Sequence, residues 1–249
     1  MSKKNSKGKQ ESERFAAPEA SYLWRYMSLG KFLSLIQNQT LYFSSIARLK
    51  RVERHEGRYV HPKNACAAYR AEEKRLDEKC GESSFLPPLT PDQYRASAEE
   101  DFLHSLFVNC WHCADHESFA MWKVYALHEG VAIRTTAARL QSSFAPKSKV
   151  KMSPVIYRHG GPTSPQLNGL TKEPYFSSER EWRAYILNPP QLEAKHWEDS
   201  PIDHINVKVR IVPLIDAIYV SPNCNWLAPV VKRCLDPTGC KAQIILSGV

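Results

Sequence analysis

The spacing of apolar residues predicts regular secondary structure from about residue 22 onward. Segment 22–26 is rich in aromatic residues, which favour strands. Ser28 can cap a helix, and Leu41–Phe43 is typical of a second short strand. Between them, the apolar residues that recur at helical spacing are Phe32, Leu33, Leu35 and Ile36. The pattern therefore predicts strand, helix and strand at the start of the folded part.

The rest of the chain mixes helical and strand periods without an internal repeat. Predicted strands cover residues 107–112, 131–133, 150–157, 179–187, 204–211, 217–220 and 242–246. Predicted helices cover residues 65–79, about 90–103, 119–125, a stretch from 136, and 226–235. The helix at 119–125 is expected to bury its larger side chains, Phe119, Met121, Trp122 and Tyr125. A loop rich in Gly, Pro, Ser and Asn occupies roughly 159–174. This mixture favours an α+β fold, in which helices decorate a mixed β-sheet.

Two segments differ in character from this pattern. Residues 1–20 are polar and lack periodicity, so they are expected to form a disordered basic leader. Residues from about 58 to 105 are charged and helical in pattern, with a break at Pro87–Pro88. They lack the apolar residues for a core of their own. We therefore expect one α+β domain over residues 21–249, with a helical insert at about 58–105.

Composition excludes several classes of protein. Hydrophobic residues make up 43% of the chain and charged residues 24%, which is typical of globular proteins. The formal net charge of +8 permits an anionic partner such as a nucleic acid, although the four lysines of the first ten residues account for half of it. No run of about 18 apolar residues predicts a membrane span. The seven cysteines are odd in number and scattered, and the start does not resemble a secretory signal. We therefore expect a cytoplasmic protein with reduced thiols and no membrane contact.

Two glutamates in the predicted strand 179–187 are the first candidates for chemistry. Residues two apart in a strand face the same way, so Glu179 and Glu181 are expected side by side, with Arg183 next on that face. The apolar face carries Trp182, Ala184 and Ile186. One interpretation is a solvated strand face with a surface ion pair between Glu181 and Arg183. The other is a carboxylate pair in a cleft, where one group stabilises positive charge and the other positions a substrate hydroxyl.

Arg25 is the second candidate, because it lies among aromatic residues in the first predicted strand. A structural interpretation is an edge-strand arginine that stacks on an aromatic ring. A functional interpretation is an anchor for a phosphate or ribose, since the guanidinium presents a fixed fork of donors.

The segment Cys110-Trp111-His112-Cys113 could suggest zinc, redox or nucleophilic chemistry. A zinc site would need further ligands from Cys224, Cys234 or Cys240, and no second closely spaced pair exists. A thioredoxin-like role would need a helix that starts directly after a strand. Adjacency of a cysteine and a histidine in sequence does not establish a catalytic hydrogen bond. We expect structural cysteines and no bound metal.

Several motifs in order carry a resemblance to a known family. They are Leu23-Trp24-Arg25-Tyr26, Leu41-Tyr42-Phe43-Ser44, His55-Glu56-Gly57, Cys110-Trp111, Met121-Trp122-x-x-Tyr125, Gly130-Val131-Ala132-Ile133 and Glu179-x-Glu181-Trp182-Arg183. Together they resemble the bacterial domain-of-unknown-function family twenty-nine seventy-one over most of residues 22–222. That family is similar to abortive-infection proteins and, more distantly, to ADP-ribosyltransferases. The turn that usually reads Asp-Pro-Phe-Glu-Gly stands here as Glu53-Arg54-His55-Glu56-Gly57.

The resemblance implies NAD as the substrate and a role in antiphage defence or as a toxin. It implies that Glu181 stabilises the oxocarbenium-like ribose as nicotinamide leaves and that Glu179 orients the acceptor. It also implies that Arg25 holds the NAD phosphate or ribose, and that Tyr26, Tyr42 and Ser44 are further residues of the NAD site. A nucleic acid or a protein would be the acceptor, and an antitoxin would be a possible partner.

Two other functions stay open from the sequence. One is a non-catalytic nucleic-acid-binding or interaction protein that uses the basic leader and the aromatic residues. The other is a metal-dependent nuclease-like toxin, with Glu179, Glu181 and His112 around the metal. Arg25 and Glu181 on opposite walls of one cleft would favour the transferase, whereas wide separation on open surface would favour the binding protein.

Overall fold

The computed structural model describes residues 21–53, 56, 100–126, 129–159, 169–189, 202–222 and 224–249. The predicted leader at 1–20 and most of the predicted insert, residues 58–99, lie outside the described residues. Residues 100–105 are helical, at the end of the helix predicted over about 90–103.

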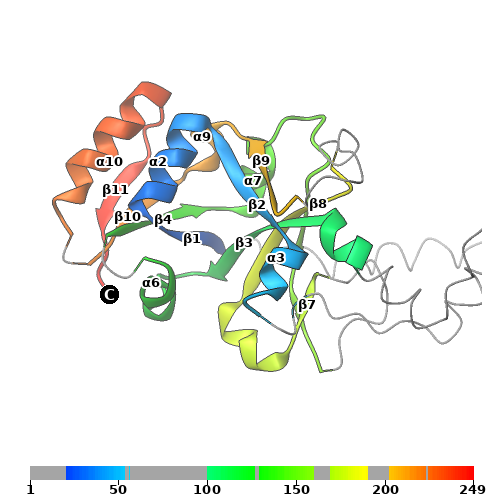
Figure 1. The fold of residues 1–249 in the computed structure, drawn as a ribbon. Helices are drawn as coiled ribbons and strands as arrows, with labels where there is room; N and C mark the ends of the chain where they lie inside the picture. The colour runs from blue at the N-terminus through cyan, green and yellow to red at the C-terminus, as the bar shows by residue number, and fades with distance from the viewer. Residues whose placement is uncertain are drawn as a thin grey trace, which may run out of the picture.

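The α+β fold predicted from the sequence is confirmed. The described residues form a nine-stranded sheet in the order β11-β10-β4-β1-β3-β2-β9, with β8 on the edge of β3 and β5 on β8 (Figure 1). Strands β10 and β11 are parallel and the other pairs are antiparallel, so the sheet is mixed. The strands are β1 (Tyr22–Ser28), β2 (Thr40–Ser45), β3 (Leu106–Ala114), β4 (Gly130–Thr135), β5 (Lys151–Pro154), β8 (Glu181–Leu187), β9 (His204–Lys208), β10 (Ala217–Val220) and β11 (Gln243–Leu246).

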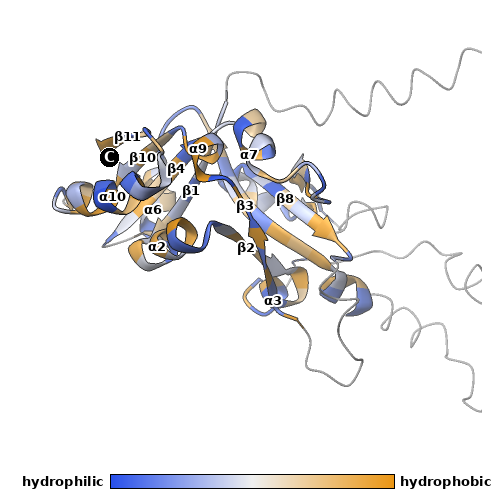
Figure 2. Cartoon of the chain, turned by 90° about the horizontal axis from the view of Figure 1, so that it is seen from above, coloured by the Kyte–Doolittle hydropathy of each residue, from blue (hydrophilic) through white to orange (hydrophobic). Residues whose placement is uncertain are grey.

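Helices cover both faces of this sheet. One face packs on the main apolar core, to which α2 (Leu29–Asn38), α7 (Ala137–Ser143), α9 (Ile211–Leu214) and α10 (Leu227–Leu235) contribute. The helix α10 buries residues four apart, Leu227, Val231 and Leu235, which gives it one hydrophobic side (Figure 2). The other face carries α6 (Phe119–Tyr125) and α3 (Ile46–Lys50), each over a smaller apolar cluster.

A gap in strand pairing lies along one edge of β3. β8 pairs with β3 from residue 106 to 112, but on the other edge β2 pairs only with 107–108 and β1 only with 112–114. The backbone groups that face this edge belong to alternate residues, so Cys110 is the residue that neither strand reaches. Side chains bridge the gap instead: Arg25 donates to the Cys110 carbonyl, and Asn109 donates to the Tyr42 carbonyl. The diverging strands β1 and β2 therefore leave an opening in the middle of the sheet.

The prediction that Glu179 lies on a strand beside Glu181 is wrong. Strand β8 begins at Glu181, and Glu179 is the last residue of the 3-10 helix η2 (Pro174–Glu179). Between them, Arg180 has a left-handed backbone with φ of 41°, which breaks the strand. The predicted loop 159–174 is also partly regular, because strand β7 (Thr171–Lys172) pairs in parallel with β6 (Ile156–Tyr157).

The helix α6 buries fewer of its side chains than the sequence pattern predicts. Ser118 caps it, and Met121 and Trp122 are buried. Phe119 and Tyr125, which were expected in the core, are 57% and 51% exposed. The reason is that this seven-residue helix rests on β1 with one narrow side, which leaves Tyr125 free to face the opening between the strands.

Candidate active site

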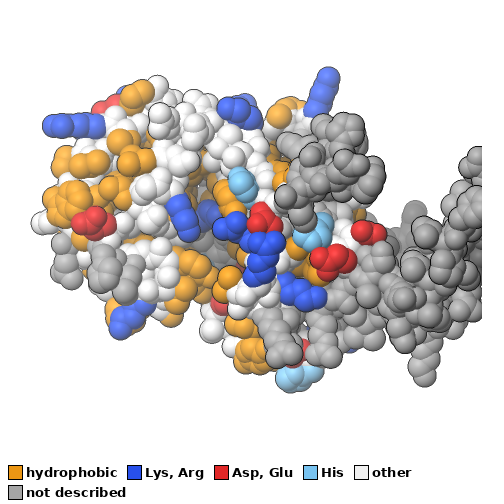
Figure 3. Space-filling view, viewed as in Figure 1, with side chains coloured by type: hydrophobic (Ala, Val, Ile, Leu, Met, Phe, Trp, Pro, Cys, Tyr) orange, Lys and Arg blue, Asp and Glu red, His pale blue; other side chains and the backbone are white. Residues whose placement is uncertain are grey.

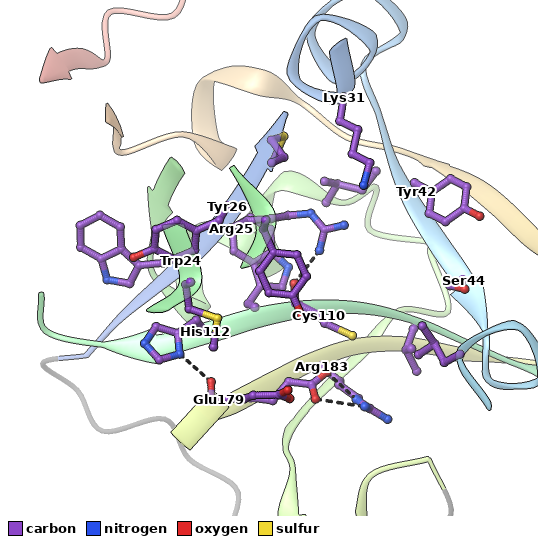
Figure 4. A pocket seen from close by; sticks show the side chains of 18 of the residues that line it. Trp24, Arg25, Tyr26, Lys31, Tyr42, Ser44, Cys110, His112, Glu179 and Arg183 are labelled. Carbon is purple, nitrogen blue, oxygen red and sulfur yellow. Dashed lines mark hydrogen bonds and ion pairs between the residues drawn. The ribbon is translucent and has the colours of Figure 1, made fainter. Parts of the chain in front are cut away.

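The opening between β1 and β2 continues into a cavity of about 620 Å³. Its walls come from β1, β2, β3, β8, α2 and α6 (Figure 4). All six residues named from the sequence line it: Arg25, Tyr26, Tyr42, Ser44, Glu179 and Glu181. Arg25 and Glu181 come from strands on opposite edges of β3, so the fold brings two distant parts of the sequence to one space.

Arg25 is a cation without a carboxylate partner among the described residues. Its Nη1 donates to the Cys110 carbonyl oxygen at 2.5 Å, and its guanidinium lies 5.8 Å from the ring centre of Trp111. Strand β1 lies between β3 and β4, so the expected edge position is wrong, and the ring it meets is on β3. Burial lowers the pKa of Arg25, although the negative charge of Glu181 acts in the opposite direction. Figure 4 shows its guanidinium and the Lys31 ammonium pointing into the same part of the cavity.

Glu181 is held in a buried clamp and not on a solvated surface. Its carboxylate accepts two hydrogen bonds from Arg183, at 2.8 and 3.0 Å. The same guanidinium donates to both oxygens of Glu56, at 2.6 and 3.0 Å, and to the Gly169 carbonyl. The exposed fraction is 7% for Glu181 and 1% for Arg183. The solvated-strand interpretation is therefore wrong for this pair.

Lys172 connects the remaining carboxylates of this end of the cavity. Its Nζ lies 2.7 Å from Glu179, 2.9 Å from Glu53, 3.4 Å from Glu181 and 3.9 Å from Glu56. The cluster thus holds four carboxylates against two cations, Lys172 and Arg183, which is an excess of two negative charges. Burial raises the pKa of Glu53, although the hydrogen bond and charge of Lys172 act in the opposite direction. This end of the cavity is therefore negative, whereas Arg25 and Lys31 make the other part positive.

The carboxyl group of Glu181 is ionised at neutral pH. Burial would raise its pKa, but the charge and hydrogen bonds of Arg183, with the charge of Lys172, outweigh burial and lower the pKa to about 2. The Cys110 thiol also helps to lower the pKa of this carboxylate, and burial keeps the pKa of the thiol well above its usual value. Cys110 is therefore a neutral thiol in the site.

The lowered pKa of Glu181 predicts a loss of stability in acid. A folded-state pKa below the usual value of 4.5 adds stability that is complete above that pH and is lost as the pH falls toward about 2. The contribution at pH 7 is on the order of 3 kcal/mol. We expect denaturant unfolding at intervals from pH 7 to pH 3 to show this loss, and we expect a flatter pH profile for Glu181→Gln. Parallel profiles for the two proteins would contradict the shifted pKa.

Two side chains fix the backbone around the turn that carries both glutamates. His112 Nδ1 lies 2.5 Å from the Glu179 carbonyl oxygen, so this nitrogen carries the hydrogen and donates. Burial lowers the pKa of His112, which keeps the ring neutral. Tyr157 accepts a hydrogen bond from the Glu181 amide at 2.7 Å. The turn is therefore held on both sides of Arg180.

Cys110 and Cys113 do not form a metal site together. They are three residues apart on β3, so their side chains lie on opposite faces of the sheet. Cys110 lines the cavity, whereas Cys113 packs against the main core. The described residues contain no group of three His, Cys, Asp or Glu side chains placed to hold a metal ion. Glu179 and Glu181 are instead bound by Lys172 and Arg183.

Several residues of this site were not named as site residues from the sequence, and four charged ones matter most here. Lys172 lies in the segment expected as a loop, and Glu53 and Glu56 belong to a turn that was read only as part of a motif. Lys31 lies on the exposed side of α2. Of these four residues, only Glu56 could have been identified from the sequence, through its position in the resembled motif.

Comparison with known proteins adds little to this description. The sequence matches no family model and no curated protein. Among solved structures, Thermus sp. 2.9 DarT in complex with carba-NAD+ has a similar chain path, with a TM-score of 0.36 and 8% identity over 93% of this chain and 97% of that chain. A similarity at this level carries no information about the cavity. No helix in the described part of the chain is long and apolar enough to span a membrane.

Proposed function

We propose that this protein is an NAD-consuming enzyme of the ADP-ribosyltransferase type, with a role as a toxin or in antiphage defence. One observation carries the proposal: Arg25, which pairs with no carboxylate in the described part of the chain, and the buried anion Glu181 line the same cavity. Both residues belong to the motifs that carry the family resemblance.

The charge distribution of the cavity matches the charges of NAD. The diphosphate is anionic, and Arg25 and Lys31 offer it hydrogen-bond donors without competing carboxylates among the described residues. The nicotinamide ring is cationic, and the excess negative charge around Glu181 favours it at the other end. A volume of about 620 Å³ lies within the usual range for small-molecule sites.

The proposed reaction breaks the bond between C1′ of the ribose and the nicotinamide nitrogen. The electron pair leaves with nicotinamide, which becomes neutral, and positive charge builds on the ribose. Glu181 is already ionised and fixed by Arg183, so it stabilises this charge without reorganisation. An acceptor oxygen or nitrogen, or water, then bonds to C1′ and loses its proton. Glu179, whose side chain is 24% exposed, is placed to orient that acceptor.

The surface around the opening supports an anionic acceptor. Figure 3 shows Lys and Arg side chains gathered near the middle of the view, with Asp and Glu side chains beside them. Arg48 lines the cavity, and Arg51 follows it after one turn, with side chains 51% and 60% exposed. Both pair with Asp203, so these three side chains together keep one excess positive charge. A nucleic acid is therefore favoured over an uncharged acceptor, and a protein acceptor would need an acidic surface.

Incubation of the purified protein with NAD tests this function, with nicotinamide release measured by chromatography. Arg25→Gln is expected to raise the KM for NAD about 10- to 100-fold, because a charged hydrogen-bond donor to the diphosphate is lost. Lys123→Gln is a matched control, since it removes a positive charge on α6 outside the cavity lining.

Two results would count against the proposal. The first is the absence of nicotinamide release by the wild-type protein with any acceptor, including water. The second is an equal KM for the wild type and Arg25→Gln while both melt at the same temperature.

A further inference from the structure

Tyr42 forms a braced aromatic surface at the mouth of the cavity. Its ring is stacked on His204, with centroids 4.7 Å apart and an interplanar angle of 16°. Tyr42 lines the cavity and His204 does not, so the histidine supports the ring from the side away from the cavity. Tyr42 is 38% exposed, which leaves ring surface for a ligand. A partly exposed ring that packs on a second ring beside an opening is a stacking surface for a planar group.

The strand pairing explains why these two rings meet. Tyr42 on β2 is directly opposite Asn206 on β9, and Ser44 is opposite His204. Tyr42 and His204 are thus diagonal neighbours on one face of two paired strands, which holds both rings in place. Asn206 also lines the cavity, and an asparagine amide can pair with the hydrogen-bonding edge of adenine.

The surface lies away from the carboxylates of the cavity. Figure 4 places Tyr42 and Lys31 at one end, Glu179 and Arg183 at the other, and Arg25 between them in that view. If the nicotinamide ribose lies against Glu181 and the diphosphate against Arg25 and Lys31, the remaining part of NAD is the adenosine. It would extend toward Tyr42.

We propose that the Tyr42–His204 stack is the adenine seat of the cavity, so that the protein distinguishes a dinucleotide from a mononucleotide. This assignment rests on the proposed function, because it takes NAD as the substrate. It predicts that adenosine monophosphate and nicotinamide mononucleotide, the two halves of NAD, bind to different ends of the cavity.

The test compares binding and turnover of these halves in Tyr42→Ala, Tyr42→Phe and His204→Ala. Tyr42→Ala is expected to weaken binding of adenosine monophosphate about 5- to 100-fold by calorimetry and to raise the KM for NAD by a similar factor. Tyr42→Phe keeps the ring and should retain binding. His204→Ala removes only the brace, so we expect a smaller loss. Tyr175→Ala is the matched control, since Tyr175 is 63% exposed and lies outside the cavity lining.

Turnover of nicotinamide mononucleotide separates this assignment from the proposed function. Tyr42→Ala should lower nicotinamide release from NAD more than nicotinamide release from the mononucleotide, because only NAD carries the adenine. Unchanged binding of adenosine monophosphate in Tyr42→Ala, with nicotinamide still released from NAD, would overturn the adenine seat alone. Failure of the wild type to bind adenosine monophosphate would also overturn it, because the surface would then serve another planar group such as an acceptor base. No nicotinamide release from either substrate would overturn the proposed function, and the binding measurement would still decide the adenine seat.

Discussion

Glu181→Gln is expected to slow nicotinamide release about 100- to 1,000-fold at saturating NAD. Breaking the ribosyl bond builds positive charge on the sugar, and a fixed anion stabilises that charge more than it stabilises bound substrate. Glutamine keeps the shape of the side chain and can accept a hydrogen bond from Arg183, but it carries no charge. Loss of one preorganised group of this kind costs about 2.7–4 kcal/mol of transition-state stabilisation. The measurement is the rate of nicotinamide release with the melting temperature of the same sample.

Glu56→Gln is the matched control for this substitution. Glu56 is the other carboxylate that accepts hydrogen bonds from Arg183, so this substitution removes one negatively charged partner of the same guanidinium. It therefore weakens the clamp to a similar degree. If loosening alone lowered activity, the two variants would lose activity equally. Glu179→Gln should reduce labelling of an acceptor more than it reduces hydrolysis of NAD, because its expected role is to orient the acceptor. Full activity of Glu181→Gln in a folded protein would remove Glu181 from the reaction.

Arg183→Met is expected to destabilise the fold by about 3–5 kcal/mol. Methionine fills much of the same volume, but two buried carboxylates would lose their main partner. Leaving buried charges unpaired has about this cost, whereas the intact pair contributes much less than its Coulomb energy suggests. Unfolding by urea, followed by circular dichroism, gives the difference in free energy. Lys172 would still meet Glu181, at 3.4 Å, which limits the loss.

The surface pair between Arg51 and Asp203 gives the comparison for this prediction. Arg51 donates two hydrogen bonds to Asp203, at 2.8 and 3.0 Å, so its contact geometry resembles that of Arg183. Its side chain is 60% exposed, and exposed pairs contribute about 0–1 kcal/mol. We therefore expect Arg51→Met to change the unfolding free energy by less than about 1 kcal/mol. Equal effects of the two substitutions would mean that burial does not set the energy of the Arg183 clamp.

Most of the secondary structure could be predicted from local residue patterns. The elements near the start of the folded part show why, because they depend on features that are close together in the sequence. The residues 29–38 combine helical apolar spacing with flanking positions that end the helix, and the structure shows α2 there. The break before β8 was missed, because nothing in the sequence around Arg180 demands a left-handed backbone. Phe119 and Tyr125 were misplaced, because spacing shows that two residues share a helix face and not how wide a face the sheet covers.

The candidate site was only partly predictable for a related reason. Alternation along a strand places Glu181 and Arg183 on one face, but it does not show whether that face is buried. The burial comes from contacts distant in sequence: Glu56 meets Arg183 across 127 residues. Nothing in the sequence predicted that Lys172 belongs to the site, because a lysine in a loop-like segment is usually a solvated residue. The charge balance of the site therefore depends on residues that only the folded chain brings together.

The single unpaired position on the edge of β3 has a mechanical consequence. The arm of the sheet that contains β1 and the arm that contains β2 are joined by β3, by α2 and by the bridge between Phe144 and Val209. Across the gap, Arg25 bonds to the Cys110 carbonyl and Asn109 bonds to the Tyr42 carbonyl. The Arg25 bond can be released without breaking any strand pair. A ligand phosphate that draws the Arg25 guanidinium away from Cys110 would release that bond as it binds. The measured affinity for an anion then includes the loss of this bond, so binding and the state of the gap are linked quantities.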